Sequence, residues 1–159
     1  MKIIGIDPGA RVTGYGIVET TPKGLKSVAF GEITFEKETP ISAVLFRVHQ
    51  EVANILDNMG IGNMAIENIF LGKSIRSLIT QAHTRGALIL ASSQMNIPVF
   101  EYSPLEIKKA VVGYGKAEKQ QVQMMVKTIL KIDEKMSFDT SDALAIAVCH
   151  AHSLQGKRL

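Results

Sequence analysis

The order of strand and helix patterns along the chain constrains the fold most strongly. Three segments with the alternating pattern of β-strands come first, at residues 2–7, 13–20 and 26–35, and turn residues separate them. Helical and strand patterns then alternate, with strands at 64–66 and 97–102 and helices at 41–59, 74–95, 104–112, 117–131 and 139–154. Strands joined through helices require covering layers, so we expect a mixed five-stranded sheet with helices on both faces.

Length and composition favour one globular domain. The 159 residues, of which 46% are hydrophobic and 21% charged, exclude a disordered chain and predict a single domain over 1–155 with a short tail at 156–159. No apolar run approaches the ~20 residues that span a bilayer, so we expect no membrane partner. The N-terminus leads directly into a strand, unlike a secretory signal. The single cysteine, Cys149, excludes an internal disulfide and favours the cytoplasm.

Positive charge is concentrated in the middle of the sequence. Residues 71–131 carry 9 basic and 3 acidic side chains, whereas the chain as a whole has a net charge of only +3. Such a segment beside acidic flanks is typical of a polyanion-binding surface with separate acidic chemistry. Solvated helix faces would give the same charge statistics, so the pattern alone leaves both interpretations open.

Four carboxylates fall where an active site is expected. Asp7 ends the first strand, Glu67 ends the fourth, and Asp139 and Asp142 lie three residues apart at the start of the last helix. Active sites of open α/β sheets lie beyond the carboxyl ends of the strands, so these groups converge if the two strands are neighbours. Oxygen ligands without His or Cys suit Mg²⁺ or Mn²⁺. Two such ions roughly 4 Å apart promote phosphodiester hydrolysis.

Each carboxylate also has an ordinary structural explanation. Asp7 can simply begin an Asp-Pro-Gly turn, and Glu67 can be exposed where its strand ends. Asp139 can be a helix N-cap with Asp142 in the first turn. Taken together, the four residues favour the metal site. The histidines are expected to be polar surface residues: His49, His83, His150 and His152.

Four stretches of the sequence resemble the RuvC family of Holliday junction resolvases. The first two are Ile4-Gly5-Ile6-Asp7-Pro8-Gly9 with Thr13-Gly14-Tyr15-Gly16, and Glu67-Asn68-Ile69-Phe70. The others are Val111-Val112-Gly113-Tyr114-Gly115-Lys116-Ala117-Glu118-Lys119 and Asp139-Thr140-Ser141-Asp142-Ala143-Leu144-Ala145-Ile146-Ala147. The similarity in residue type and order runs from about residue 3 to 152. The last two stretches are the most specific, because the opening Asp-x-Gly also occurs in actin-like sugar kinases.

The resemblance implies a ribonuclease H-like three-layer fold and a homodimeric, Mg²⁺-dependent endonuclease that cuts four-way DNA junctions. Two Mg²⁺ ions, which Mn²⁺ can replace, are implied at each site. Paired nicks with 5′-phosphate and 3′-hydroxyl ends, which a ligase can seal, are implied as the product. The branch-migration proteins RuvA and RuvB are implied as partners.

The resemblance also assigns residues. It implies that Asp7, Glu67, Asp139 and Asp142 are the catalytic metal ligands, and that Phe70 lies near the crossover, where its ring can stack on an unpaired base. It implicates Lys108 and Lys119 in DNA binding, and from the basic segment we also expect DNA contacts from Lys73, Arg76 and Lys116. The chain departs from the family pattern Leu-Gly-Gln-Ala-Arg-Gly at Ala82 and His83, where a glycine and a glutamine are usual.

Three alternatives to this function remain. The chain can be a junction-binding module without catalysis, although all four acidic residues are present. It can be a fragment of an ATP-dependent sugar kinase, although such folds need a second domain and a further phosphate loop. It can also be a related ribonuclease H-like nuclease that acts on RNA or single strands, because metal-dependent hydrolysis does not depend on which sugar the strand contains.

Overall fold

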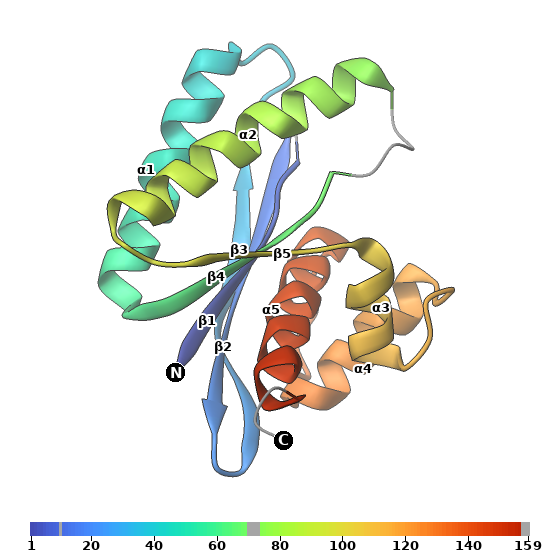
Figure 1. Cartoon of the computed structure of the whole chain (residues 1–159). Helices are drawn as coiled ribbons and strands as arrows, with labels where there is room; N and C mark the ends of the chain where they lie inside the picture. The colour runs from blue at the N-terminus through green and yellow to red at the C-terminus, as the bar shows by residue number, and fades with distance from the viewer. Residues whose placement is uncertain (10, 70–73, 157–159) are drawn as a thin grey trace.

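The computed structural model describes residues 1–9, 11–69 and 74–156, apart from the side chain at 155 (Figure 1). Five strands and five helices form within these residues, in an order that agrees with the sequence patterns. The strands are β1 (Lys2–Asp7), β2 (Val12–Thr21), β3 (Gly24–Thr34), β4 (Ile61–Glu67) and β5 (Val99–Tyr102). The helices are α1 (Ile41–Met59), α2 (Ile75–Gln94), α3 (Pro104–Val112), α4 (Lys119–Leu130) and α5 (Phe138–Gly156).

The strands form one mixed sheet in the order β3-β2-β1-β4-β5. The first three strands are an antiparallel meander, and β4 and β5 add to the other edge of β1 in parallel. This arrangement confirms the predicted five-stranded mixed sheet. It also makes β1 and β4 direct neighbours, which is the condition for bringing Asp7 and Glu67 together.

Helices cover both faces of the sheet (Figure 1): α1 and α2 lie on one face, and α3, α4 and α5 lie on the other. Side chains alternate along a strand, so β1 contributes to both cores. Ile4 and Ile6 pack with Val48 of α1 and Leu88 of α2. Ile3 faces the opposite way and belongs to the core formed with α3, α4 and α5. The predicted three-layer architecture is therefore present.

The ends of several elements differ from the sequence patterns. Helix α1 ends at Met59 as predicted, because Gly60 adopts the left-handed conformation (φ 63°), but β4 begins directly after it at Ile61 and not at 64. Helix α4 begins at Lys119 and not at 117, because Glu118 is extended and serves as its N-cap. Strand β5 starts at Val99, two residues later than predicted.

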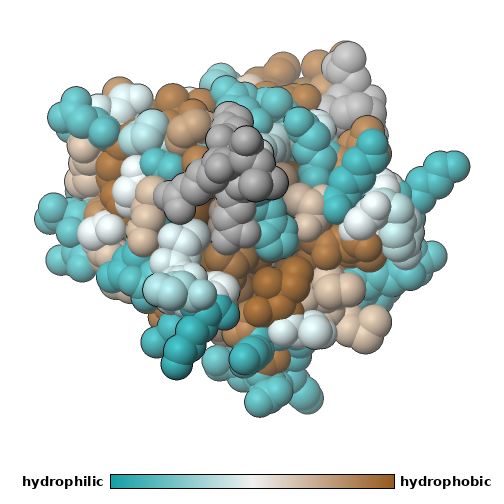
Figure 2. Space-filling view, turned by 60° about the horizontal axis from the view of Figure 1, so that its bottom comes forward, coloured by the Kyte–Doolittle hydropathy of each residue, from teal (hydrophilic) through white to brown (hydrophobic). Residues whose placement is uncertain are grey.

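Helix α5 ends at Gly156, the first residue of the predicted tail. Within the described ranges, no helix combines the length and apolarity needed to cross a bilayer. On the face shown in Figure 2, hydrophilic residues surround a compact hydrophobic area.

Candidate active site

Two of the predicted carboxylates lie side by side at the carboxyl edge of the sheet. Ile6 of β1 is paired with Ile66 of β4, and the next residues of these parallel strands are Asp7 and Glu67. Both isoleucines point into the core under α1 and α2. Because side chains alternate, Asp7 and Glu67 are directed to the other face, where α5 lies.

Helix α5 carries the remaining two carboxylates and packs directly on the sheet. A Cβ atom on Gly5 would overlap the carbonyl oxygen of Ala143, and one on Gly14 would overlap that of Asp139. These two glycines therefore allow the helix backbone to contact the strands. Gly14 is also the register partner of Asp7, so the first turn of α5 lies over the end of β1.

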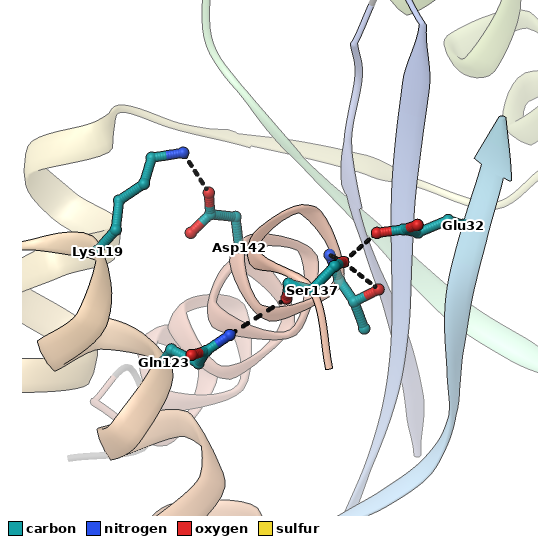
Figure 3. Close-up of polar contacts among 6 residues, drawn as sticks. Glu32, Lys119, Gln123, Ser137 and Asp142 are labelled. Atoms are coloured by element: carbon teal, nitrogen blue, oxygen red, sulfur yellow. Dashed lines mark hydrogen bonds and ion pairs between the residues drawn. The ribbon is translucent and has the colours of Figure 1, made fainter. Parts of the chain in front are cut away.

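The start of α5 is held by contacts to two other elements (Figure 3). The Ser137 hydroxyl accepts a hydrogen bond from the Thr140 N–H (3.1 Å) and donates one to the carboxylate of Glu32 on β3. The Gln123 side chain on α4 donates to the carbonyl oxygen of Met136 (3.1 Å). Ser137 is thus the N-capping residue, and the alternative that Asp139 is the N-cap is wrong.

Glu32 and Gln123 were not identified from the sequence. No local motif marks them, because each contacts the start of α5 across a long sequence separation. Ser137 did carry a signal, since a serine three residues before Thr140 fits an N-cap. With this serine as the cap, Asp139 is left free to face the other acidic residues.

A pocket of about 390 Å³ opens at this place. Its lining combines three of the predicted carboxylates with two predicted lysines and with residues of four helices: Asp7, Glu67, Asn68, Gln81, Pro104, Ile107, Lys108, Lys119, Val122, Asp142 and Ile146. Asp139 is not part of the lining. Asn68 and Gln81 are polar residues of the pocket that the sequence analysis did not name as site residues; Asn68 directly follows Glu67, whereas Gln81 comes from the middle of α2.

The electrostatics of the site couple Asp7 to each of the other three carboxylates. The pKa of Asp7 is raised from 3.8 to about 7, first by burial and then by the negative charges of Glu67, Asp142 and Asp139, in that order. Burial also raises the pKa of Asp142, with Asp139 contributing in the same direction. These negative charges repel one another, so the cluster is unfavourable unless cations neutralise it.

One cation of the protein already lies within the cluster. The Lys119 ammonium donates to Oδ2 of Asp142 at 3.1 Å (Figure 3). Burial lowers the pKa of Lys119, but Asp142, Asp7 and Asp139 together outweigh burial, and the net shift is upward. Lys108 contributes positive charge near Asp142 as well. The pocket thus presents carboxylates and lysines to the same space.

The donor set fits hard divalent cations, because it consists of carboxylate oxygens without nearby thiolate or imidazole. In the conformation shown, no three acidic, His or Cys side chains of the described residues are grouped closely enough to hold a metal ion. The mutual repulsion of the carboxylates and the ion pair between Lys119 and Asp142 are consistent with this separation. The raised pKa of Asp7 is the observation that favours a cation site, since a divalent ion would offset both the burial and the repulsion that raise this pKa.

The predicted DNA-binding residues are distributed around and beyond the pocket. Lys108 and Lys119 line it. Lys116 is exposed on the loop that leads to α4, and Arg76 is exposed on the first turn of α2, away from the pocket lining. Phe70 and Lys73 lie outside the described residues.

The prediction that the histidines are surface residues is wrong for His150. This side chain is 1% exposed and stacks on Phe100, with 4.2 Å between the ring centroids. Its nitrogens are hydrogen-bonded to Asn63 (2.8 Å) and to the Tyr102 hydroxyl (2.7 Å). Partners from β4 and β5 satisfy the buried ring, and such long-range pairing has no local sequence signal. His83 is exposed, as expected.

Comparison with known proteins shows to which family this chain belongs. The model of the family described as "Crossover junction endodeoxyribonuclease RuvC" matches residues 3–150. This chain belongs to the RuvC family. A RuvC relative from Geotalea uraniireducens is 45% identical over 153 residues, which cover 96% of this chain and 90% of the relative. Nucleases of the RuvC family are metal-dependent.

Solved RuvC structures agree with the fold over the whole chain. The structure of Thermus thermophilus RuvC superposes with a TM-score of 0.91 at 28% identity, covering 99% of this chain and 97% of that one. The same RuvC in complex with a Holliday junction substrate also gives a TM-score of 0.91 at 28% identity, covering 98% and 96%. The ribonuclease H-like fold expected from the RuvC resemblance is confirmed.

Proposed function

We propose that this protein resolves Holliday junctions by metal-dependent hydrolysis of one phosphodiester bond in each of two opposing strands. The observation that carries the proposal is the meeting of Asp7, Glu67 and the two aspartates of α5 at one sheet edge, in a chain of the RuvC family. The solved complex of a RuvC relative with a Holliday junction supports this substrate.

The catalytic roles follow from the positions of the residues. Asp7, Glu67, Asp139 and Asp142 would hold two Mg²⁺ ions, for which Mn²⁺ can substitute. Bound there, the ions would activate a water for attack on the phosphorus and stabilise the leaving 3′-oxygen, which gives 5′-phosphate and 3′-hydroxyl ends. Lys119 would exchange Asp142 for a phosphate oxygen as DNA enters, because its ammonium is the cation nearest to that carboxylate. Lys108 would contact the same backbone from α3.

A homodimer is part of this proposal, because one pocket can cut only one strand at a time. One face of α2 is exposed along its whole length and combines large apolar residues with small ones: Ile75, Ile79, Ala82, His83, Gly86 and Leu90. Three of them, Ile75, Ile79 and Leu90, are 77%, 52% and 53% exposed. Such a stripe is typical of a helix that packs on a partner, and Ala82 and His83, the two departures from the family pattern, lie on it.

We expect Ile79→Lys to convert the protein from a dimer to a monomer. A charged side chain in the middle of the α2 stripe would be desolvated between two copies. Sedimentation velocity would measure the change in mass, and Met124→Lys is the matched control, because Met124 is 67% exposed on α4. A wild-type protein that sediments as a monomer at micromolar concentration, or a dimer unaffected by Ile79→Lys, would contradict the assignment of this face.

Cleavage of a labelled four-way junction tests the function itself. We expect symmetric nicks in the junction with Mg²⁺, none with EDTA, and much slower cleavage of a linear duplex of the same sequence. Binding without nicks would favour the non-catalytic junction-binding module. Equal cleavage of single strands or of RNA would favour the related nuclease, and ATP hydrolysis would favour the kinase fragment.

Two wider expectations accompany the proposed function. The family resemblance supports RuvA and RuvB as partners that deliver the junction, and co-elution with RuvA and RuvB on junction DNA would measure this. The single cysteine and the junction substrate support action in the cytoplasm. We also propose that residues 1–155 act as one nuclease domain.

A further inference from the structure

The loop between α3 and α4 presents an aromatic side chain that the catalytic chemistry does not use. Tyr114 lies between Gly113 and Gly115 and is 46% exposed. A tyrosine that packed in the core would be buried. Val111 and Ala117, the core residues on either side of it in the sequence, are both buried. The side chain is therefore partly open to solvent, on the loop between α3, which lines the pocket with Lys108, and α4, which lines it with Lys119.

The path of this loop is fixed at both ends. Gly113 ends α3 in the left-handed region (φ 93°), and its N–H donates to the carbonyl oxygen of Lys109 at 2.9 Å. The backbone at Gly115 lies against Leu105, because a Cβ there would overlap the Cδ1 atom of that side chain. At the other end, the Glu118 N–H donates to the Gln121 side chain at 2.8 Å in a capping box. The loop is thus preformed, and little order has to be gained when Tyr114 binds a ligand.

Charge around the loop favours a polyanion. Residues 108–119 contain four lysines and one acidic residue, Glu118, whose side chain is used in the capping box. Lys108 and Lys119 line the pocket with the carboxylates, whereas Lys109 and Lys116 are exposed, five residues before and two residues after Tyr114. The aliphatic part of Lys109 lies close to Gly115, since its Cε atom is 3.7 Å from where a Cβ of Gly115 would be. Leu105, which is 51% exposed, adds apolar surface beside Gly115, the residue after Tyr114.

We propose that Tyr114 is a base-stacking residue, on which a nucleobase of the bound DNA strand rests next to the phosphate held in the carboxylate pocket. Lys109 and Lys116 then neutralise the phosphates that flank this base. An exposed aromatic ring among lysines is the arrangement with which proteins bind unpaired nucleotides, because every base has a face that can stack. This inference rests on the proposed function, since it takes the strand in the pocket to be DNA.

Junctions that contain 2-aminopurine at successive positions around the cleavage point would test the stacking. The fluorescence of this base is quenched when an aromatic ring stacks on it, and EDTA keeps the junction uncut during the measurement. We expect wild type and Tyr114→Phe to quench one or two positions, and Tyr114→Leu to lose that quenching and bind the junction roughly tenfold more weakly. Phe46→Leu is the matched control, because Phe46 is an aromatic residue 64% exposed on α1, on the other side of the sheet.

The outcomes separate this inference from the proposed function. If wild type binds and cuts junctions but Tyr114→Leu gives the same quenching and affinity, the stacking role is refuted and the nuclease function stands. If Tyr114→Phe is as defective as Tyr114→Leu, the hydroxyl and not the ring carries the contact, which also refutes stacking. If wild type neither binds nor cuts junctions, the proposed function fails first. Thermal unfolding of Tyr114→Leu is expected to match wild type, because the side chain is exposed.

Discussion

Asp7→Asn is expected to bind four-way junctions and to cut them about 10³-fold more slowly, or not at all. The charges of all three other carboxylates raise the pKa of Asp7, so Asp7 lies at the centre of the proposed cation site. An amide there keeps the size of the side chain but removes the negative charge that would hold a divalent ion. Cleavage and gel-shift assays on the same junction would separate catalysis from binding.

The same substitution is expected to stabilise the metal-free protein. The pKa of Asp7 is about 7 in the folded chain and 3.8 by its ordinary value, so the folded state binds the proton more tightly. Protonated Asp7 favours folding, and this contribution, up to about 4 kcal/mol, is lost as the pH rises from about 4 to about 7. In EDTA at pH 8, Asp7→Asn should therefore melt several degrees above wild type, and at pH 4 the two should converge.

Asp57→Asn is the matched control for both measurements, because Asp57 is an exposed aspartate of α1. It should cut junctions at the wild-type rate and should leave the melting temperature unchanged at pH 8. Retained cleavage by Asp7→Asn would refute the assignment of the carboxylates. A melting temperature below that of wild type in EDTA would show that the cluster is not electrostatically strained.

Much of the fold could be predicted from local patterns. The antiparallel meander and the helix over 41–59 follow from periodicity and from turn residues, whereas the pairing of β1 with β4 was only a condition for the predicted site. Element ends were less predictable, because they depend on single conformations such as that of the extended Glu118, after which α4 begins. Those conformations are set by contacts that a periodic pattern does not contain.

The residues of the candidate site also differ in how well the sequence predicts them. Asp7 and Glu67 could be predicted because each ends a strand, and strand ends meet at the sheet edge. Gln81 could not, because only the packing of α2 places the middle of that helix against the pocket. The contacts of Ser137 with Glu32 and of His150 with Tyr102 likewise join residues that are distant in sequence.

Gly5→Ala is expected to destabilise the protein by roughly 3 kcal/mol and to lower its melting temperature by about 10 °C. The new methyl group would overlap the carbonyl oxygen of Ala143 and would lie 2.6 Å from the backbone nitrogen of Ala147. Both atoms belong to the backbone of α5, so no side-chain rotation can relieve the overlap. The helix or the strand has to shift as a unit.

Such a shift would also move Asp142, one residue before Ala143, away from Asp7, so that cleavage falls even among molecules that remain folded. Gly62→Ala is the matched control on the neighbouring strand, since its methyl group would lie 3.1 Å from the flexible side chain of Met1 and at an ordinary contact distance of 3.6 Å from the carbonyl oxygen of Lys2. Thermal unfolding and junction cleavage of the two variants would measure both effects. If Gly5→Ala melts and cuts as Gly62→Ala does, the contact between β1 and α5 is looser than described. In that case, close packing of α5 on the sheet is not what brings the aspartates to Asp7.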